Sequence, residues 1–392
     1  MVANAWSVPD RSHDHPVEEA VALQMKPDIG AGETHDPRAG ARNLLLNCVG
    51  MQAGQDLLFV TEPPGLGYFD DDIAVVVANE ARSLGGNVNL LEAPPSGGPD
   101  DFPADVAAAM RQADHTIFFS RLGDQLRFCA LPGTGSKTMA TTLEVGYLGA
   151  ELGRVPHGLF EAMYDRLVAA IRGAGRYRIR CPLGTDLEMT FDTKGDPDAG
   201  RITTDFTVKP FPVMIFPPLS CAAMSGRLVL ARWLTSTAVR AYDDSVLTLE
   251  TPVTAHIEAG RIVRFEGEPA VAAEVERQFE RIGAQARGDA HAVESWHAGI
   301  NPKCFFIGDP AADVERWGNV IYGSPRATHF HMCGTNPGEM ACTLIDASIW
   351  FDDALFWDAG RFRFLDRPEI QALMSDYPGS EGAFAMRRDI GV

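Results

Sequence analysis

The chain has 392 residues, of which 45% are hydrophobic, and its 34 basic and 53 acidic side chains give a formal net charge of −19. This length favours two domains over one, and the hydrophobic content is sufficient for packed cores, which excludes wholesale disorder. The acidic balance argues against binding to nucleic acid or to an anionic membrane surface, because both need a basic protein surface.

The sequence also carries signals about compartment. It contains no uninterrupted apolar run close to the roughly 18 residues of a membrane-spanning helix. Its first 20 residues lack the basic start and the apolar run of a secretory signal. The seven cysteines are scattered and never spaced as CxxC, which is typical of reduced thiols rather than of disulfides or a structural zinc site. We therefore expect a cytoplasmic protein.

Residues 1–40 are polar and are predicted to form a flexible extension. From residue 41 the pattern predicts helices over 41–54, 73–86 and 103–113, alternating with strands over 56–62, 87–93 and 114–120. Such alternation is typical of a parallel sheet covered on both faces. A long helical stretch over 151–173 follows, and we place a domain boundary near residue 176. The first domain is therefore predicted to be an α/β domain of residues 41–176.

The second half, residues 177–392, has a different pattern. Alternation of period two between glycine or aspartate turns predicts antiparallel strands over 177–193, 200–208, 245–268 and 348–364. One helix is predicted over 269–288. The second domain is therefore expected to be an α+β domain with a mainly antiparallel sheet, and we expect it to hold the metal and the catalytic site.

Three common catalytic or cofactor motifs are missing or incomplete. PPGLGYFD offers Gly65 and Gly67, but no third glycine opens a helix at the interval of a dinucleotide fingerprint. In LPGTGSKT, residues 131–138, the lysine does not directly follow a glycine, which favours a surface loop over a phosphate loop. The chain contains no GxSxG segment, which argues against a serine hydrolase of the nucleophile-elbow type.

The histidines are more informative. His329 and His331 are separated by one residue, so on a strand their side chains share a face and lie about 6–7 Å apart along it. Two imidazoles so placed can bind one metal ion. His297, in ESWHAGINP, precedes a glycine–asparagine–proline turn and is the natural third ligand. Candidate carboxylates nearby in the sequence are Asp346, Asp352 and Glu294. The sequence leaves open a set of three histidines or two histidines with Asp346.

The type of ligand narrows the metal. Imidazoles with or without a carboxylate, and without a thiolate, suit iron(II), zinc or manganese. A set of two histidines and one carboxylate with open positions is typical of non-haem iron(II) and of oxygen chemistry. Cys333 is close in sequence to the histidine pair, but we expect it to pack in the core.

Five segments occur in the order seen in a known family. They are LGTDLEMTF (183–191), WHAGINP (296–302), GNVIYG (318–323), THFHMCGTNPG (328–338) and IDASIWFDDALFWDAGRF (345–362). Over residues 41–365 the chain resembles the aminopeptidase T family of metallopeptidases. It is more similar to the oxygenase relatives of that family, which are typified by 2,5-dihydroxypyridine 5,6-dioxygenase.

The chain departs from both patterns. The peptidases hold a metal pair with glutamates, histidines and an HxD motif, whereas PPLSCAAMSGRLV (217–229) lacks the glutamate expected there, and His297 stands near a glutamate position. The dioxygenases have a histidine in the GINP segment and a later HxD. That motif is matched by His329-Phe330-His331, with histidine in place of aspartate. It is matched alternatively by Leu344-Ile345-Asp346, which keeps the aspartate and loses the histidine.

The resemblance implies one iron(II) ion on His297, His329 and His331, or with Asp346 replacing one of them. It implies a homo-oligomer that opens a hydroxylated heteroaromatic ring with dioxygen. Two alternatives are an aminopeptidase or amidohydrolase that uses zinc or manganese, and a binding protein without turnover. In a cleft between the domains, the common place for small-molecule sites, Glu188 and His115 are candidate general bases, and Tyr322 is a candidate hydrogen-bond partner of the substrate.

Overall fold

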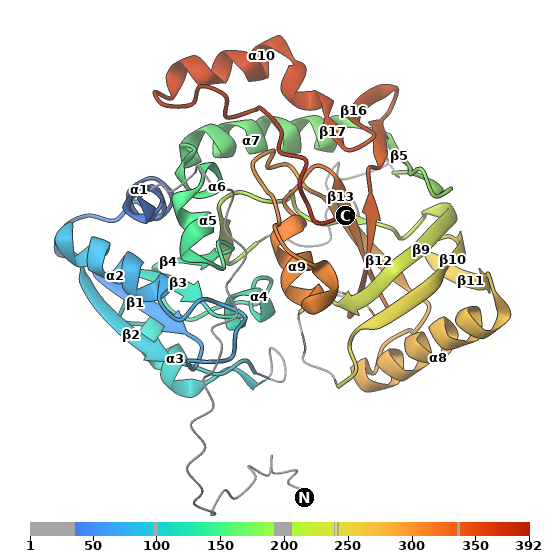
Figure 1. Ribbon diagram of the computed structural model, residues 1–392, viewed down its shortest axis with the longest axis horizontal. Helices are drawn as coiled ribbons and strands as arrows, with labels where there is room; N and C mark the ends of the chain where they lie inside the picture. The colour runs from blue at the N-terminus through green and yellow to red at the C-terminus, as the bar shows by residue number, and fades with distance from the viewer. Residues whose placement is uncertain (1–35, 97–100, 192–205, 239, 241–242, 335–337) are drawn as a thin grey trace, which may run out of the picture.

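The computed structural model describes residues 36–96, 101–191, 206–238, 240, 243–334 and 338–392. Its strands form a five-stranded sheet in the order β2-β1-β3-β4-β7 and a separate twelve-stranded sheet (Figure 1). Every strand pair of the first sheet is parallel, and every strand pair of the second is antiparallel. The predicted fold class is therefore confirmed. The predicted extension over 1–40 lies largely outside the described residues.

The first sheet is built from short apolar strands with helices between them. Its strands are β1 (Asp56–Thr61), β2 (Asn87–Glu92), β3 (His115–Phe119), β4 (Ser136–Ala140) and β7 (Lys209–Phe211). The helices of this half are α1 (Pro37–Arg42), α2 (Ile73–Ser83), α3 (Ala104–Met110), α4 (Leu122–Gln125), α5 (Val145–Gly149), α6 (Glu151–Arg154) and α7 (His157–Gly173). All residues of the central strand β3 are buried, as expected for a parallel strand covered on both faces.

Helix boundaries follow from local chemistry. The helix predicted over 41–54 begins earlier, because Asp36 accepts a hydrogen bond from the backbone N–H of Arg38 and Pro37 occupies the first helical position. It continues as a π-helical segment, η1 (Asn43–Cys48). The stretch predicted as one helix over 151–173 is broken between α6 and α7, since Pro156 cannot continue a helix from the preceding turn.

The two halves exchange elements across residue 176. The first sheet takes its last strand, β7, from beyond this position, where it pairs with β4. Conversely, Leu159, Met163 and Leu167 of α7 pack in the hydrophobic core of the second sheet. The segment 131–138, which we predicted to be a surface loop, already contains the start of β4 at Ser136, because residues 138–140 are buried beside β3.

The second sheet runs in the order β17-β16-β15-β5-β6-β9-β14-β13-β12-β8, with β10 and β11 attached to β9. Its strands are β5 (Arg176–Arg180), β6 (Asp186–Thr190), β8 (Leu219–Ser220), β9 (Ser225–Ser236), β10 (Leu247–Glu258), β11 (Arg261–Glu266), β12 (Val293–Ala298), β13 (Ala327–Met332), β14 (Met340–Ile345), β15 (Ser348–Phe351), β16 (Ala354–Asp358) and β17 (Arg361–Phe362). Most of the strand predicted over 200–208 lies outside the described residues.

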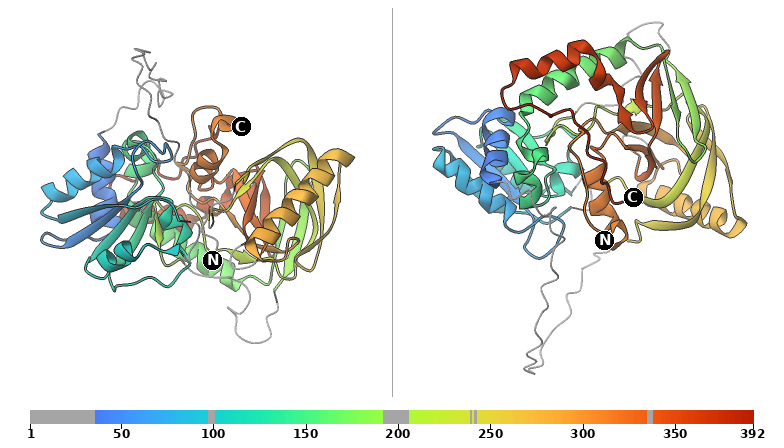
Figure 2. Two further views of the ribbon diagram at one scale, coloured as in Figure 1. Left: turned by 90° about the horizontal axis from the view of Figure 1, so that it is seen from below. Right: turned by 45° about the horizontal axis from the view of Figure 1, so that its top comes forward.

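Helices complete this half of the molecule. They are α8 (Pro269–Ala286), α9 (Val314–Ile321), α10 (Pro368–Gln371) and the short 3-10 turns η3 (Pro310–Ala312), η4 (Arg363–Asp366) and η5 (Ala372–Asp376). Helix α8 packs on β10 and β11, and α9 stands between the two sheets in the views of Figures 1 and 2. None of the helices in the described part of the chain has the length and apolar character needed to cross a membrane.

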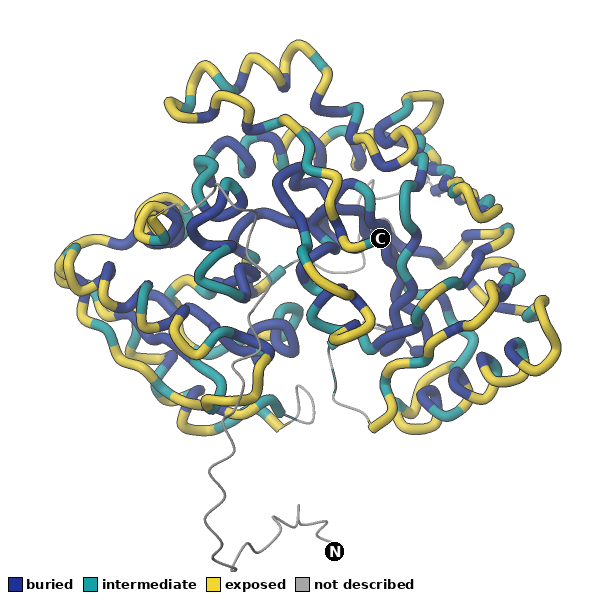
Figure 3. Tube along the Cα trace, in the orientation of Figure 1, coloured by how far each residue is buried: buried dark blue, intermediate teal, exposed yellow. Residues whose placement is uncertain are grey.

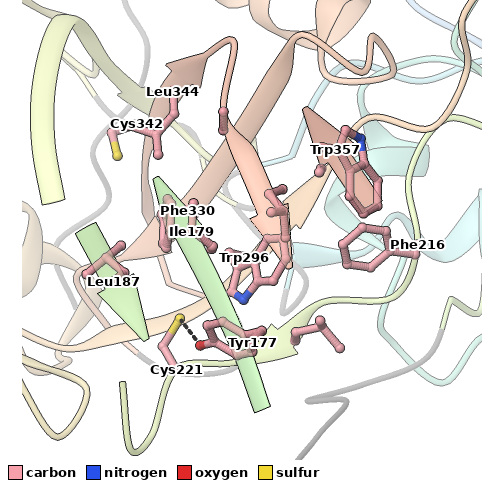
Figure 4. Packing of buried hydrophobic residues seen from close by; sticks show 14 of the residues in the cluster. Tyr177, Ile179, Leu187, Phe216, Cys221, Trp296, Phe330, Cys342, Leu344 and Trp357 are labelled. Atoms are coloured by element: carbon pink, nitrogen blue, oxygen red, sulfur yellow. Dashed lines mark hydrogen bonds between the residues drawn. The ribbon is translucent and has the colours of Figure 1, made fainter. Parts of the chain in front are cut away.

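Aromatic side chains fill the core beside strand β12 of the second sheet. Trp296 is fully buried and lies between Tyr177 and Phe216, with ring centroids 5.2 and 5.5 Å away (Figure 4). The chain trace is buried around the centre of the molecule and exposed at its periphery (Figure 3). This packing holds strands β12 and β13 rigidly at the centre, where the predicted metal ligands lie.

Candidate metal centre

Two neighbouring antiparallel strands bring the three predicted histidine ligands together. In the register of β12 and β13, His297 is directly opposite His329, and Ser295 is opposite His331. Side chains alternate along a strand, so Trp296 and Phe330 enter the apolar core while the histidines share the other face. The turn after β12 requires Gly299, because a Cβ there would collide with the carbonyl of Ser324, which lies just before β13.

The three imidazoles form a compact, buried cluster. Their ring centroids are 5.0 Å apart for His297 and His329, 4.9 Å for His297 and His331, and 5.1 Å for His329 and His331. One potential ligand nitrogen from each ring lies within 4.8 Å of those of the other two. The three side chains are at most 2% exposed. The cluster therefore has the spacing and the donor chemistry of a site for a single metal ion.

Unpaired nitrogens support a metal at this position. His297 Nδ1 lies 2.5 Å from the backbone carbonyl of Phe216 and must donate to it, which leaves Nε2 without a proton. His297 Nε2 and His329 Nδ1 are buried and have no hydrogen-bond partner among the described residues. A buried unpaired polar group costs about 1–3 kcal/mol, and coordination to a metal ion would remove this penalty at both nitrogens.

A chain of hydrogen bonds at its Nδ1 atom orients the ring of His331. Ser295 Oγ donates to the carboxylate of Glu294, so it must accept from His331 Nδ1, which lies 3.1 Å away. The Glu294 carboxylate is itself 4.0 Å from that nitrogen, and its side chain is 6% exposed. Such partners of a ligating histidine fix the ring and increase its basicity. The arrangement leaves Nε2 of His331 for a metal ion.

Burial keeps the cluster in its metal-binding protonation state. It lowers the pKa of His297 to about 3 and holds the pKa values of His329 and His331 well below the usual range. Neighbouring histidines and the positive charge of Arg127 contribute further lowering of the pKa at His329 and His331. All three imidazoles are consequently neutral near pH 7, and neutral imidazole is the form that ligates metals.

A pocket of about 250 Å³ opens onto the cluster, with His329 and His331 in its wall. One side of the pocket is formed by Thr235, Ser236 and Thr237 of the second sheet and by Glu315 and Asn319 of α9. The other side comes from segments that follow the carboxyl ends of β1 and β3, including Tyr68, Arg121 and Asp124. The pocket therefore lies between the two sheets, at the edge of a parallel sheet where α/β proteins usually bind ligands.

Asp346 lies away from the cluster. Both of its carboxylate oxygens accept hydrogen bonds from Arg326, at 2.7 and 2.8 Å. Because Ile345 pairs with Ala327, Asp346 stands beside the start of β13, and three residues of strand, roughly 10 Å, separate that point from His329. The set of two histidines with Asp346 is thus not assembled, and the three histidines remain.

Neither candidate general base reaches the pocket. Glu188 is exposed on β6, because Leu187 and Met189 on either side of it face the core. His115 is at the amino end of β3, whereas the pocket lies beyond the carboxyl end of that strand. Both ring nitrogens of His115 are already paired, with Ser136 at 2.8 Å and with Gln55 at 2.9 Å. Neither residue is therefore placed to act on a molecule bound in this pocket.

Tyr322 does reach the pocket, from the carboxyl-terminal cap of α9. Its ring stacks on His329, with centroids 4.0 Å apart and an interplanar angle of 19°. Its hydroxyl is 3.4 Å from the hydroxyl of Thr235. The tyrosine therefore supports the ring of His329 and also lines the pocket.

Sequence reasoning missed a buried ion pair beside the histidines. Arg127 Nη1 is 2.7 Å from Asp124 Oδ1, and the two side chains are 13% and 7% exposed. Both residues line the pocket with His329. The available signal was the polar segment RLGDQLRF (121–128) directly after the strand predicted over 114–120, because the carboxyl ends of parallel strands carry ligand-binding loops.

Comparison with known proteins agrees with this architecture. No family model and no curated protein matches the chain. Among solved structures, it is similar to 2,5-dihydroxypyridine dioxygenase from Pseudomonas putida KT2440, with a TM-score of 0.55 and 14% identity over 82% of this chain and 96% of that one. It is also similar to AmpT from Thermus thermophilus, with a TM-score of 0.51 and 13% identity over 83% and 98% of the two chains. The predicted resemblance is confirmed for the fold.

The hydrogen-bonded chain behind His331 gives a first prediction. Ser295→Ala is expected to weaken metal binding by about 10–100-fold, because the imidazole loses the bond that orients it. Competition with a chromophoric chelator measures this affinity. Ser348→Ala is the matched control, since Ser348 lies in the same sheet and its hydroxyl accepts from the backbone of Ala359, away from the histidines. Equal metal affinity in the two variants would contradict the orienting role of Ser295.

Proposed function

We propose that this protein is a non-haem iron(II) dioxygenase that opens a hydroxylated N-heteroaromatic ring such as 2,5-dihydroxypyridine. The observation that carries the proposal is the cluster of three buried, neutral imidazoles, two of which, His329 and His331, line the pocket between the two sheets. All three ligands come from one sheet, so an ion held by them would face the pocket with positions left for substrate and dioxygen. The likeness in fold to a dihydroxypyridine dioxygenase is consistent with this chemistry.

The number of metal sites supports the dioxygenase over the peptidase. Among the described residues, the three histidines are the one group of at least three histidine, cysteine or acidic side chains placed to hold a metal ion. A two-metal aminopeptidase needs further carboxylate ligands around the same centre. The carboxylate of Asp346 is engaged by Arg326, and that of Glu294 lies behind Ser295. A single ion on three histidines fits these side chains best.

The residues and the size of the pocket suggest how a ring would be bound and deprotonated. A volume of about 250 Å³ is slightly below the usual range for ligand pockets, roughly 300–1,000 Å³, which favours a single-ring substrate. Asp124 is a suitable proton acceptor for a ring hydroxyl, because burial raises the pKa of its carboxyl against the effect of Arg127. When bound, iron(II) supplies the electron transfer between ring and dioxygen. The protein positions the ring, removes its proton and excludes water.

Metal content and oxygen uptake test the proposal. The full chain is loaded anaerobically with iron(II), its metal content is determined, and oxygen consumption is followed with 2,5-dihydroxypyridine and related hydroxylated rings. We expect one iron per chain and substrate-dependent uptake of one dioxygen per ring opened. Hydrolysis of aminoacyl amides by zinc- or manganese-loaded protein, with two metals per chain and no oxygen uptake, would instead establish the aminopeptidase or amidohydrolase alternative. Binding of rings without either turnover would identify a non-catalytic relative.

A further inference from the structure

Arg127 carries an unused donor next to the metal centre. Its Nη1 binds Asp124, but its Nε is buried and has no hydrogen-bond partner among the described residues. The residue lines the pocket together with His329 and His331. Its positive charge also acts on all three imidazoles: Arg127 adds to the effect of burial in lowering the pKa of His297, and to the effects of burial and the neighbouring histidines in lowering those of His329 and His331. A buried cation with a free donor therefore adjoins the histidine cluster.

The charge of the metal centre also favours a negatively charged group in the pocket. Within the described part of the chain, no carboxylate joins the three histidines as a ligand, so a divalent ion there would keep both positive charges. A ring bound through one deprotonated hydroxyl would cancel one of them. The second charge and the buried free donor of Arg127 remain to be balanced by another anionic group.

The other charged residues of the pocket are already satisfied by the protein. Arg121 is held at two points by Glu62, both at 2.9 Å, and Arg240 pairs with Glu339 at 3.0 Å. On the acidic side, Asp124 pairs with Arg127, and Glu315 accepts a hydrogen bond from Ser245 at 2.6 Å. Arg127 is thus the pocket arginine that still has a buried donor to offer.

We propose that the substrate is a hydroxylated aromatic ring that also carries a carboxylate, and that this carboxylate binds between the metal centre and Arg127. A guanidinium presents several donors in one plane, so Arg127 can keep Asp124 on Nη1 and bind a second carboxylate through the rest of the group. The inference rests on the proposed function for its aromatic ring, and it narrows the substrate class to hydroxyaryl carboxylates. 2,5-Dihydroxypyridine, which lacks a carboxylate, then represents the reacting ring but not the complete substrate.

Binding without turnover tests this inference. Zinc-loaded protein is titrated calorimetrically with 3-hydroxypyridine and with 3-hydroxypyridine-2-carboxylate, which differ only in the carboxylate. We expect the carboxylate to bind at least tenfold more tightly. In Arg127→Gln this ratio is expected to fall by at least tenfold, because only the carboxylate loses a contact with the guanidinium. Because Arg127→Gln leaves Asp124 unpaired, the double variant Arg127→Gln/Asp124→Asn serves as a second test, in which the ratio should fall equally.

A further variant separates charge from the contact with Arg127. His331→Asp adds one negative charge to the ligand set, so it should reduce the preference for the carboxylate while Arg127 is intact. A ratio near one in the unaltered protein, no binding of either ring, or a ratio that survives in both Arg127 variants would overturn the inference. The proposed function is judged separately by oxygen uptake: a carboxylate preference in zinc-loaded protein, without uptake in iron-loaded protein, would leave the anion site standing and remove the dioxygenase.

Discussion

His297→Ala is expected to abolish stoichiometric metal binding and, with it, oxygen uptake. Substitutions behind a metal ligand already lower affinity by about 10–100-fold, so the loss of a ligand should exceed roughly 100-fold. The ring of His297 is fully buried between the two other imidazoles and the carbonyl of Phe216, and among the described residues only His329 and His331 join it as candidate ligands. Metal content after gel filtration of the iron- or zinc-loaded protein measures the effect, and circular dichroism verifies that the variant is folded.

Asp346→Asn is the matched control for this prediction. Asp346 was the competing candidate ligand, and it is occupied by Arg326 at the start of β13. The substitution should keep one metal per chain while it weakens an ion pair that is half-exposed at most. Retention of metal by His297→Ala, together with its loss from Asp346→Asn, would show that the ligand set is built around the aspartate and that the three-histidine centre is incorrect.

The second large effect concerns stability. Trp296→Ala is expected to lower the free energy of unfolding by about 3–5 kcal/mol, because it leaves a large cavity in a packed core. Trp296 is fully buried and its ring contacts those of Tyr177, Phe216, Phe330 and Phe351. It also directly precedes His297, so metal affinity should fall with stability. Urea denaturation of the metal-free protein measures the first quantity.

Val263→Ala provides the comparison for Trp296→Ala. Val263 lies on β11 and is 53% exposed, so its substitution should change the free energy of unfolding by no more than about 0.5 kcal/mol. A similar small change for Trp296→Ala would mean that the aromatic core beneath β12 does not support the metal centre in the way its packing indicates.

The sequence was sufficient for the parts of the site that depend on local geometry. His329 and His331 share a strand face because strand side chains alternate, and the glycine turn after His297 places the third ligand at the end of a neighbouring strand. The alternating helices and strands of the first half follow from apolar periodicity in the same way. These features depend on a few adjacent residues, so they can be predicted from the sequence alone.

The rest of the site depends on contacts between distant segments. Asp124 and Arg127 share the pocket with His329 and His331, which come more than 200 residues later in the chain, only because the end of β3 faces strand β13. Asp346 follows the motif region closely in sequence, yet the antiparallel pairing of β13 and β14 carries it to the opposite end of the strand from His331. The parallel pairing of β7 with β4 likewise could not be predicted, because β7 is only three residues long. Strand register and the crossover connections between strands determine these positions, and neither produces a pattern in the local sequence.

The division of the pocket between two sheets has a consequence for how this protein can diversify. The proposed metal ligands stand on adjacent strands of one sheet, whereas Arg121, Asp124 and Arg127 belong to a loop and short helix of the other. Substitutions in that segment can therefore alter which molecule is accepted while the coordination chemistry stays intact. In a scaffold arranged in this way, substrate selectivity can change through substitutions in a single segment. A library of variants confined to residues 121–128 is therefore the first place to look for activity on new substrates.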